Sequence, residues 1–183
     1  VNASGRLETA KIALNLFLQK NEINAGKIAK ELVELNAQRK NMTADGVELA
    51  KQIGCEKKQI IVGYRNDETF LKTEFEQNGE VYISTEDGSA GTKGNVMDAI
   101  RENGLDAEII YACGPTPMLR ALKAYAAEHG MECWLSLEEK MACGIGACLA
   151  CVCKSKDIDE HSHVHNKRIC KDGPVFAAEE VEL

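Results

Sequence analysis

Four cysteines towards the C-terminal end constrain this chain more than any other feature of its sequence. They follow a C-x4-C-x2-C spacing with a fourth cysteine further on, and they are Cys143, Cys148, Cys151 and Cys170. This is the spacing of a plant-type [2Fe–2S] centre, in which four thiolates hold two irons. Gly144 and Gly146 reach backbone angles that let a loop wrap closely round an inorganic core. The spacing therefore predicts a cluster-binding loop and one-electron chemistry.

Other uses of these thiols remain open. A structural zinc site more often uses two C-x2-C pairs. A disulfide framework needs an oxidising compartment, and the sequence carries no signal peptide. Cys153 follows Cys151 by two residues, and it is either an alternative ligand or a buried free thiol.

Three histidines alternate between the third and fourth of these cysteines. On a strand, His161, His163 and His165 would share one face and could hold a metal. The surrounding residues are so polar that we expect a solvated loop instead. A mixed His/Cys cluster of the Rieske type is disfavoured, because four suitably spaced cysteines are present.

Composition excludes several classes of function. The net charge of −7 argues against nucleic-acid binding, which requires a basic face. No apolar run approaches the roughly 20 residues of a membrane span. Without an export signal the eight cysteines are expected in a reducing compartment. We therefore expect a cytoplasmic protein that binds neither nucleic acid nor membrane.

Hydrophobic periodicity divides the chain into three parts. Residues 1–45 have a helical pattern, broken at residues 24–26, and carry no recognised motif. Residues 46–138 alternate strands and helices, which predicts an α/β domain with a parallel sheet and right-handed crossovers. Residues 139–183 form the cluster tail. The expected strands are 59–64, 81–84, 108–112 and 133–137, and the expected helices are 67–77, 95–103 and 117–129. Tyr111 and Trp134 are expected to fill the core.

Ligands of an open parallel sheet bind where its strands end. Residues after the first three strands are therefore candidates for a nucleotide site, and they are Gly63, Arg65, Asp87, Gly88, Cys113, Gly114, Pro115 and Met118. Pro117 can start a helix without losing a needed amide bond, and the N-terminus of that helix favours a phosphate. The alternatives are an exposed charge at Arg65 and a flexible surface loop at residues 85–94.

Two motifs of the chain resemble the ferredoxin–NADP reductase superfamily. The loop Cys113-Gly114-Pro115-Thr116-Pro117-Met118 is similar to the C-terminal loop of that superfamily. Residues 136–151 and 170–176 resemble the iron–sulfur tail of the electron-transfer subunits of NAD-dependent dihydroorotate dehydrogenases. The resemblance extends from about Gly46 to Leu183.

The resemblance implies an electron-transfer role in pyrimidine biosynthesis. It implies that Cys143, Cys148, Cys151 and Cys170 bind a [2Fe–2S] cluster, and that the loops after the strands bind NAD(H). It further implies a hetero-oligomer with a catalytic subunit that contains FMN and oxidises dihydroorotate. Electrons would pass from that FMN through the cluster to FAD and then to NAD+.

The sequence departs from the family at its N-terminal end. The family carries an FAD-binding β-barrel and then a Gly-Gly-Gly-Ile-Gly-like loop, whereas residues 39–46 here read Arg-Lys-Asn-Met-Thr-Ala-Asp-Gly. We therefore expect the FAD-binding domain to be missing from these residues and nucleotide binding to be weak. Two alternative functions follow: a truncated, non-catalytic interaction module with a structural metal or cluster, and a reductase fragment that serves another redox partner.

Overall fold

The computed structural model describes residues 11–52, 55, 57–144, 146–160 and 162–183. The chain divides into two compact units. We call Lys51–Cys133 the α/β unit, and we call Val1–Ala50 together with Trp134–Leu183 the terminal unit. Each unit is described by itself.

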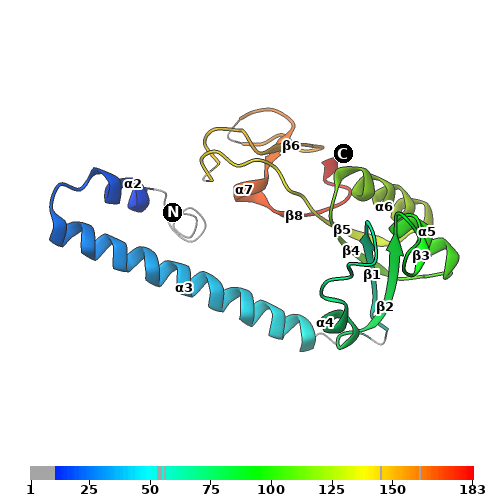
Figure 1. Ribbon diagram of the computed structural model, residues 1–183. Coiled ribbons are helices and arrows are strands. Elements are labelled where there is room, and N and C mark those ends of the chain that lie inside the picture. Colours follow the sequence, from blue (N-terminus) through cyan, green and yellow to red (C-terminus); the bar gives the residue numbers. More distant parts are fainter. Residues whose placement is uncertain (1–10, 53–54, 56, 145, 161) are drawn as a thin grey trace. The chain divides into compact units, whose positions relative to one another are not determined.

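The α/β unit contains a parallel sheet whose strands lie in the order β1-β2-β3. These strands are β1 (Gln59–Tyr64), β2 (Glu80–Thr85) and β3 (Thr92–Lys93). Aliphatic residues of β1 pair in register with β2, as in the pair of Ile61 and Tyr82. Helix α5 (Val96–Glu102) packs against all three strands, as Figure 1 shows. The first two strands begin and end within one residue of the predicted limits.

Two further helices and a strand complete the α/β unit. They are α4 (Lys72–Glu76), β4 (Ile109–Cys113) and α6 (Thr116–His129). Helix α5 begins with a capping box between Asn95 and Asp98. Helix α6 ends at Gly130, whose φ of 69° an L-residue with a side chain adopts only with strain. The apolar core of the unit consists of Val96, Met97, Ile100, Leu105 and Leu122.

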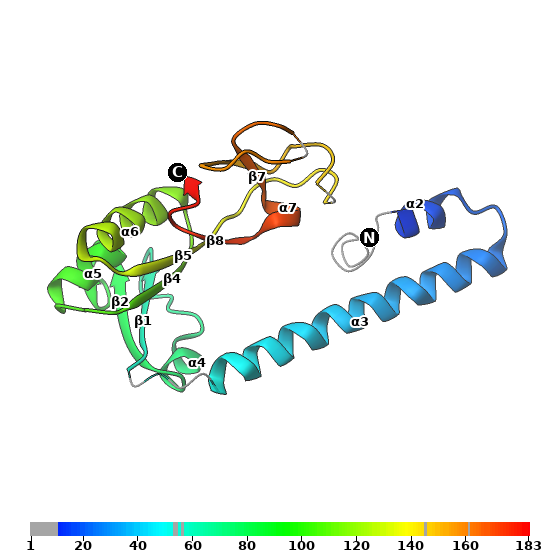
Figure 2. The same ribbon diagram turned by 180° about the vertical axis from the view of Figure 1, so that it is seen from behind.

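The terminal unit combines two N-terminal helices with a small β-rich tail. Its helices are α2 (Lys11–Leu18) and most of α3 (Glu22–Gln52). In the tail, β6 (Val152–Ser155) pairs antiparallel with β7 (Asn166–Arg168) and with β9 (Val181–Glu182). Strand β5 (Glu132–Ser136) begins in the α/β unit, and its later residues pair with β8 (Val175–Ala177). Figure 2 shows β7 running directly into the short helix α7 (Ile169–Asp172).

The predicted fold class, an α/β chain with a parallel sheet, is confirmed. Three details differ. The helical break lies at residues 19–21 and not at 24–26, because the Asn21 side chain accepts the amides of Ile23 and Asn24 and so starts α3. The helix expected over 67–77 is only Lys72–Glu76 long. Tyr111 is 75% exposed and does not fill the core.

Strand β4 lies outside the β1-β2-β3 sheet, although a single parallel sheet was expected. Strand β4 instead lies next to β5 in a second sheet. The amide of Glu132, at the start of β5, donates to the carbonyl of Glu108, which immediately precedes β4. Among the described residues, no helix is long and apolar enough to cross a membrane.

Candidate functional site

The loop that carries the first three cluster cysteines turns back on itself through left-handed backbone angles. Gly144 has a φ of 70°, Gly146 a φ of 80° and Leu149 a φ of 57°. A Cβ at Gly146 would come within 3.0 Å of the Lys171 side chain and 3.3 Å of the Arg168 side chain. The glycine therefore allows the loop to lie against α7, the helix that carries the fourth cysteine.

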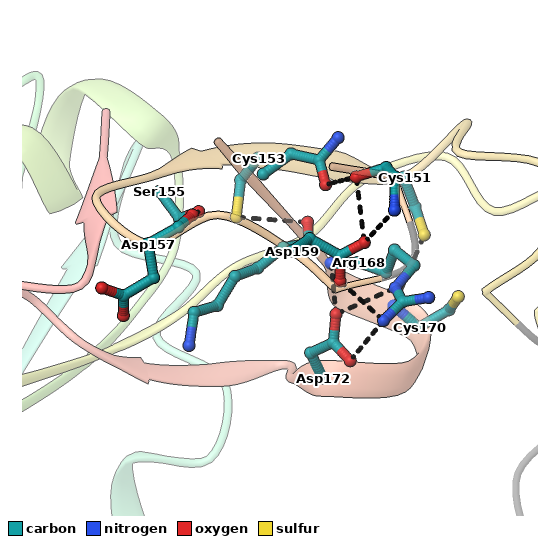
Figure 3. A network of polar contacts seen from close by, with 11 residues as sticks. Cys151, Cys153, Ser155, Asp157, Asp159, Arg168, Cys170 and Asp172 are labelled. Atoms are coloured by element: carbon teal, nitrogen blue, oxygen red, sulfur yellow. Dashed lines mark hydrogen bonds and ion pairs between the residues drawn. The ribbon is translucent and has the colours of Figure 1, made fainter. Parts of the chain in front are cut away.

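The four cysteines are arranged as two pairs. The amide of Cys148 donates to the Cys143 sulfur at 3.4 Å, and the amide of Cys170 donates to the Cys151 sulfur at 3.4 Å. Figure 3 shows the second pair, in which Cys151 precedes β6 and Cys170 lies on α7. Amides that point at sulfur stabilise negative charge on it, as a bound cluster requires.

Cysteines of both pairs contribute to the electrostatics of Cys170. Burial raises the pKa of the Cys170 thiol, and the Cys151 thiol and the charges of Cys151 and Cys143 raise it further. The amide of Gly146 opposes this by lowering the pKa. A coordinated metal would oppose these effects, because its positive charge favours the thiolate form of a coordinating cysteine. The chemistry of this donor set fits an iron–sulfur cluster.

A single metal ion is the alternative to a cluster. Within the residues that the structure describes, no three His, Cys, Asp or Glu side chains gather closely enough to hold one ion. A [2Fe–2S] cluster needs a different arrangement, with two thiolates for each of its two irons. The amide contacts put the four cysteines in two pairs, which is the number of pairs that this arrangement requires.

The other four cysteines are Cys55, Cys113, Cys133 and Cys153. Burial raises the pKa of both Cys133 and Cys153, and the Cys153 sulfur lies 3.7 Å from the carbonyl of Lys167. Cys55 and Cys113 are exposed. Cys153 therefore has the environment of a half-buried free thiol.

Of the alternating histidines, His163 and His165 lie in the connection between β6 and β7 and not on a strand. His163 has a φ of 56° and is exposed. The His165 ring lies 2.7 Å from the carbonyl of Lys156, and it is exposed as well. His161 lies outside the described residues, so the alternative of a three-histidine face is not described by the structure.

The loops after β1 and β2 meet, as the sequence predicted for a parallel pair. The amide of Glu86 donates to Tyr64, and the amide of Asp87 donates to Arg65. The Asp87 carboxylate accepts both the hydroxyl and the amide of Ser89, and these bonds lower the pKa of Asp87. Gly88 has a φ of 79° and lies against the Lys93 side chain.

The third loop lies against the core of the same unit. Met118 packs on the core cluster of the α/β unit, and a Cβ at Gly114 would meet the Met118 methyl carbon at 2.6 Å. Pro115 precedes α6 with an extended backbone, and Cys113 ends β4 with its side chain exposed. Four positions of the predicted nucleotide site, namely Gly63, Arg65, Asp87 and Gly88, therefore lie on two joined loops. Cys113, Gly114, Pro115 and Met118 lie on the third.

A pocket of about 710 Å³ opens at the end of β1. Its lining includes Gly63 and Arg65 and extends to Phe70. Tyr64 shapes its wall, because the Tyr64 hydroxyl donates to the carbonyl of Phe70 at 2.6 Å and the two rings meet edge to face. Sequence reasoning identified Gly63 and Arg65 but not the two aromatic residues, whose packing depends on a turn that the periodicity did not resolve.

Sequence reasoning also missed a polar network beside the fourth cysteine. Arg168 is 6% exposed, and its guanidinium binds Asp159 at 2.8 Å and Asp172 at 3.1 Å. The hydrogen bond from Arg168 to Asp172 is the main cause that raises the pKa of Arg168. The sequence signals this network only by an arginine that lies two residues before Cys170 in a polar segment. A solvated loop would show the same pattern.

Comparison with known proteins agrees with this site. Residues 138–182 match the family model described as the iron–sulfur cluster binding domain of dihydroorotate dehydrogenase B. The electron transfer subunit of dihydroorotate dehydrogenase B (NAD(+)) from Caldanaerobacter subterraneus subsp. tengcongensis is 49% identical over 133 residues, which are 73% of this chain and 52% of the relative. The subunit of the same name from Bacillus velezensis is 40% identical over 179 residues, which are 97% of this chain and 60% of the relative.

A solved structure of an NADH-dependent reduced ferredoxin-NADP oxidoreductase is similar to this chain with a TM-score of 0.58 and 30% identity. The similarity covers 69% of this chain and 44% of that one. The chain spans 52% of the length of the Caldanaerobacter relative and 60% of that of the Bacillus relative. On this basis the chain is a homologue of the electron transfer subunits of dihydroorotate dehydrogenase B, and residues 138–182 are its iron–sulfur cluster binding domain.

Proposed function

We propose that the chain serves electron transfer between an FMN-containing dihydroorotate dehydrogenase catalytic subunit and NAD(H), in pyrimidine biosynthesis. Cys143, Cys148, Cys151 and Cys170 would hold a [2Fe–2S] cluster. When bound, such a cluster accepts and donates one electron at a time. The chain would work in the cytoplasm, where thiols stay reduced and available to metals.

The pairing of the four cysteines carries this proposal. In each pair a backbone amide already points at a sulfur atom of its partner. These bonds stabilise charge on the sulfurs, and so they tune the reduction potential. Cys148 is exposed whereas Cys151 is 3% exposed, so one side of the site faces solvent and the other faces protein. A redox partner could therefore approach the site from the Cys148 side.

The joined loops of the α/β unit support an NAD(H) site. The pocket beside Arg65 offers a cation and two aromatic rings. Asp87, held by Ser89, places a carboxylate on the neighbouring loop, where it can accept a hydroxyl of a ribose. FAD, which the sequence resemblance implies as the carrier next to NAD+, would take part in the assembled complex.

The test is elemental and spectroscopic analysis of protein prepared without oxygen. We expect about two irons and two sulfides for each chain, and visible absorption that dithionite bleaches. Cys148→Ala should abolish this absorption, whereas Cys55→Ala should leave it intact. Protein that contains zinc and no iron would refute the proposal and favour a non-catalytic interaction module.

The partner and the nucleotide need separate measurements. Co-purification with a flavin-containing subunit, followed by FMN analysis of the complex, tests the partner. Titration with NADH tests the nucleotide site, for which Arg65→Ala should weaken binding. An iron-loaded chain that captures no flavoprotein would instead favour a reductase fragment with another redox partner.

A further inference from the structure

Arg168 lies between two carboxylates at the point where β7 becomes α7. Its Nη2 donates to Asp159 at 2.8 Å, and its Nε donates to Asp172 at 3.1 Å. The side chains of Arg168 and Asp159 are both only 8% exposed. A buried charge is stable only when it is paired and hydrogen-bonded, so removing Arg168 would leave the buried Asp159 carboxylate without its cationic partner.

The two carboxylates belong to different segments of the tail. Asp159 lies in the connection between β6 and β7, where it also accepts the amide and the hydroxyl of Ser162. Asp172 is the last residue of α7, and it also accepts the amide of Arg168 at 2.8 Å. Arg168 therefore ties that connection to both ends of the helix that carries Cys170 (Figure 3).

Helix α7 is in turn joined to the third cysteine. The amide of Ile169 donates to the carbonyl of Cys151 at 3.0 Å, and the amide of Cys170 donates to the Cys151 sulfur. A shift of α7 would therefore move Cys170 away from Cys151. Lysine could not hold α7 as arginine does, because its single ammonium lacks the planar fork that reaches two carboxylates at fixed angles.

We propose that Arg168 is a positioning residue, which holds α7 so that Cys170 stays paired with Cys151 for cluster binding. The inference rests on the proposed function. Arg168 does not ligate iron; it fixes the segment that does. Removing such supporting contacts typically weakens metal binding about 10- to 100-fold.

The experiment compares full-length variants that carry a reconstituted cluster. Arg168→Met removes both ion pairs, and Arg168→Lys keeps a charge that can reach one carboxylate. Lys167→Met is the matched control, since Lys167 lies on the same strand and pairs with the half-exposed Glu180 at 3.1 Å. Val181→Ala controls for lost stability alone, because Val181 is fully buried in the tail and its aliphatic side chain carries no charge.

Two readouts separate positioning from stability. The first is the half-time of cluster loss to a chelator, together with the reduction potential and the electron paramagnetic resonance signal. The second needs no iron: phenylarsine oxide bridges two adjacent thiols, and mass spectrometry locates the bridge. We expect Arg168→Met to lose the cluster about tenfold faster, to shift the signal and to lose the bridge between Cys151 and Cys170. Arg168→Lys should lie between it and the native protein.

Unchanged half-time, signal and arsenical bridge in Arg168→Met would overturn the proposal, as would equal losses in Val181→Ala. Should Arg168→Met fail to fold, Asp159→Asn tests the tie between Arg168 and the β6–β7 connection, because it keeps the side-chain size and removes one of the two charges that Arg168 pairs with. If the native protein binds no iron, the proposed function fails. The arsenical bridge still decides whether Arg168 positions Cys170.

Discussion

Gly91, on the loop between β2 and β3, offers the sharpest test of how the α/β unit is built. Its φ is 63°, and a Cβ added there would overlap the carbonyl oxygen of Ile83 and lie 2.8 Å from the carbonyl carbon. Gly104 has nearly the same angle, 57°, but a Cβ there would have no atom within 4 Å. Gly91→Ala and Gly104→Ala therefore share the cost of a left-handed alanine and differ only in the overlap.

The size of the difference follows from the contacts near Gly91. A left-handed alanine costs about 1–2 kcal/mol, which both variants incur. The overlap at Gly91 involves backbone and cannot be relieved by a side-chain rotation, so the loop must move away from β2. That movement breaks the bonds between Thr85 and Ala90, at 2.8 and 3.1 Å, each worth about 1 kcal/mol. We expect Gly91→Ala to lose about 3–4 kcal/mol in total.

The assay is urea unfolding followed by circular dichroism, with thermal melting as a second measure. For a unit of this size, 1 kcal/mol corresponds to about 4–8 °C, so the melting temperature of Gly91→Ala should fall by more than about 10 °C. Because Gly91 closes the loop that carries Asp87, the variant should also lose NADH binding. If the two alanine variants unfold within about 0.5 kcal/mol of each other, the described packing of the loop on β2 is wrong.

Three further results are expected. Leu135→Ala should destabilise the tail by about 2–5 kcal/mol, because Leu135 is fully buried, whereas Val175→Ala at a half-exposed position should change urea unfolding by less than about 0.5 kcal/mol. Ser89→Ala should raise the pKa of Asp87 in a carboxyl NMR titration, because the hydroxyl that stabilises the carboxylate is gone. The stabilising effect of Asp87 is present above its unfolded pKa and disappears as pH falls through the lowered folded pKa, and an unmoved titration would refute the assigned bond. Removal of iron by a chelator should increase hydrogen exchange at β6 and α7 and leave β1 and β2 unchanged; equal increases at both places would contradict the assignment of the metal to the tail.

The elements that the sequence predicted well are those whose signals are local. Strand β1 is an aliphatic run, and α5 and α6 begin at Asn95 and near Pro117, which are local start signals. Helix α3 was misjudged at Gly26, because a glycine inside a long helix is tolerated where nothing surrounds it. Strands β7 and β9 are two or three residues long, and their existence depends on pairing with β6 rather than on their own residues.

The sheet was also only partly predictable. In a doubly wound sheet a central strand has neighbours on both sides, but the described residues ahead of β1 form helix α3. Among the described residues β1 pairs with β2, and β4 lies in a second sheet with β5 and β8.

Some parts of the candidate site were likewise predictable from the sequence, and others were not. Cysteine spacing selected the four thiols as candidate ligands, but not the amides that contact them, because those depend on backbone angles at Gly144 and Leu149. The loops after β1 and β2 were predicted from topology alone, since parallel strands end at the same edge. Arg168 was not predictable, because its two carboxylates are brought to it by the path of the tail.

The eight thiols are buried to different degrees, so an alkylating reagent should modify them at different rates. Cys55 and Cys113 lie open to an alkylating reagent, while the raised pKa values of Cys133 and Cys153 keep both protonated and slow to react. A metal at the tail would mask Cys148 as well, although it is exposed. Timed alkylation and peptide mass mapping would then report loading of the centre in turbid or dilute extracts, where colour cannot be measured.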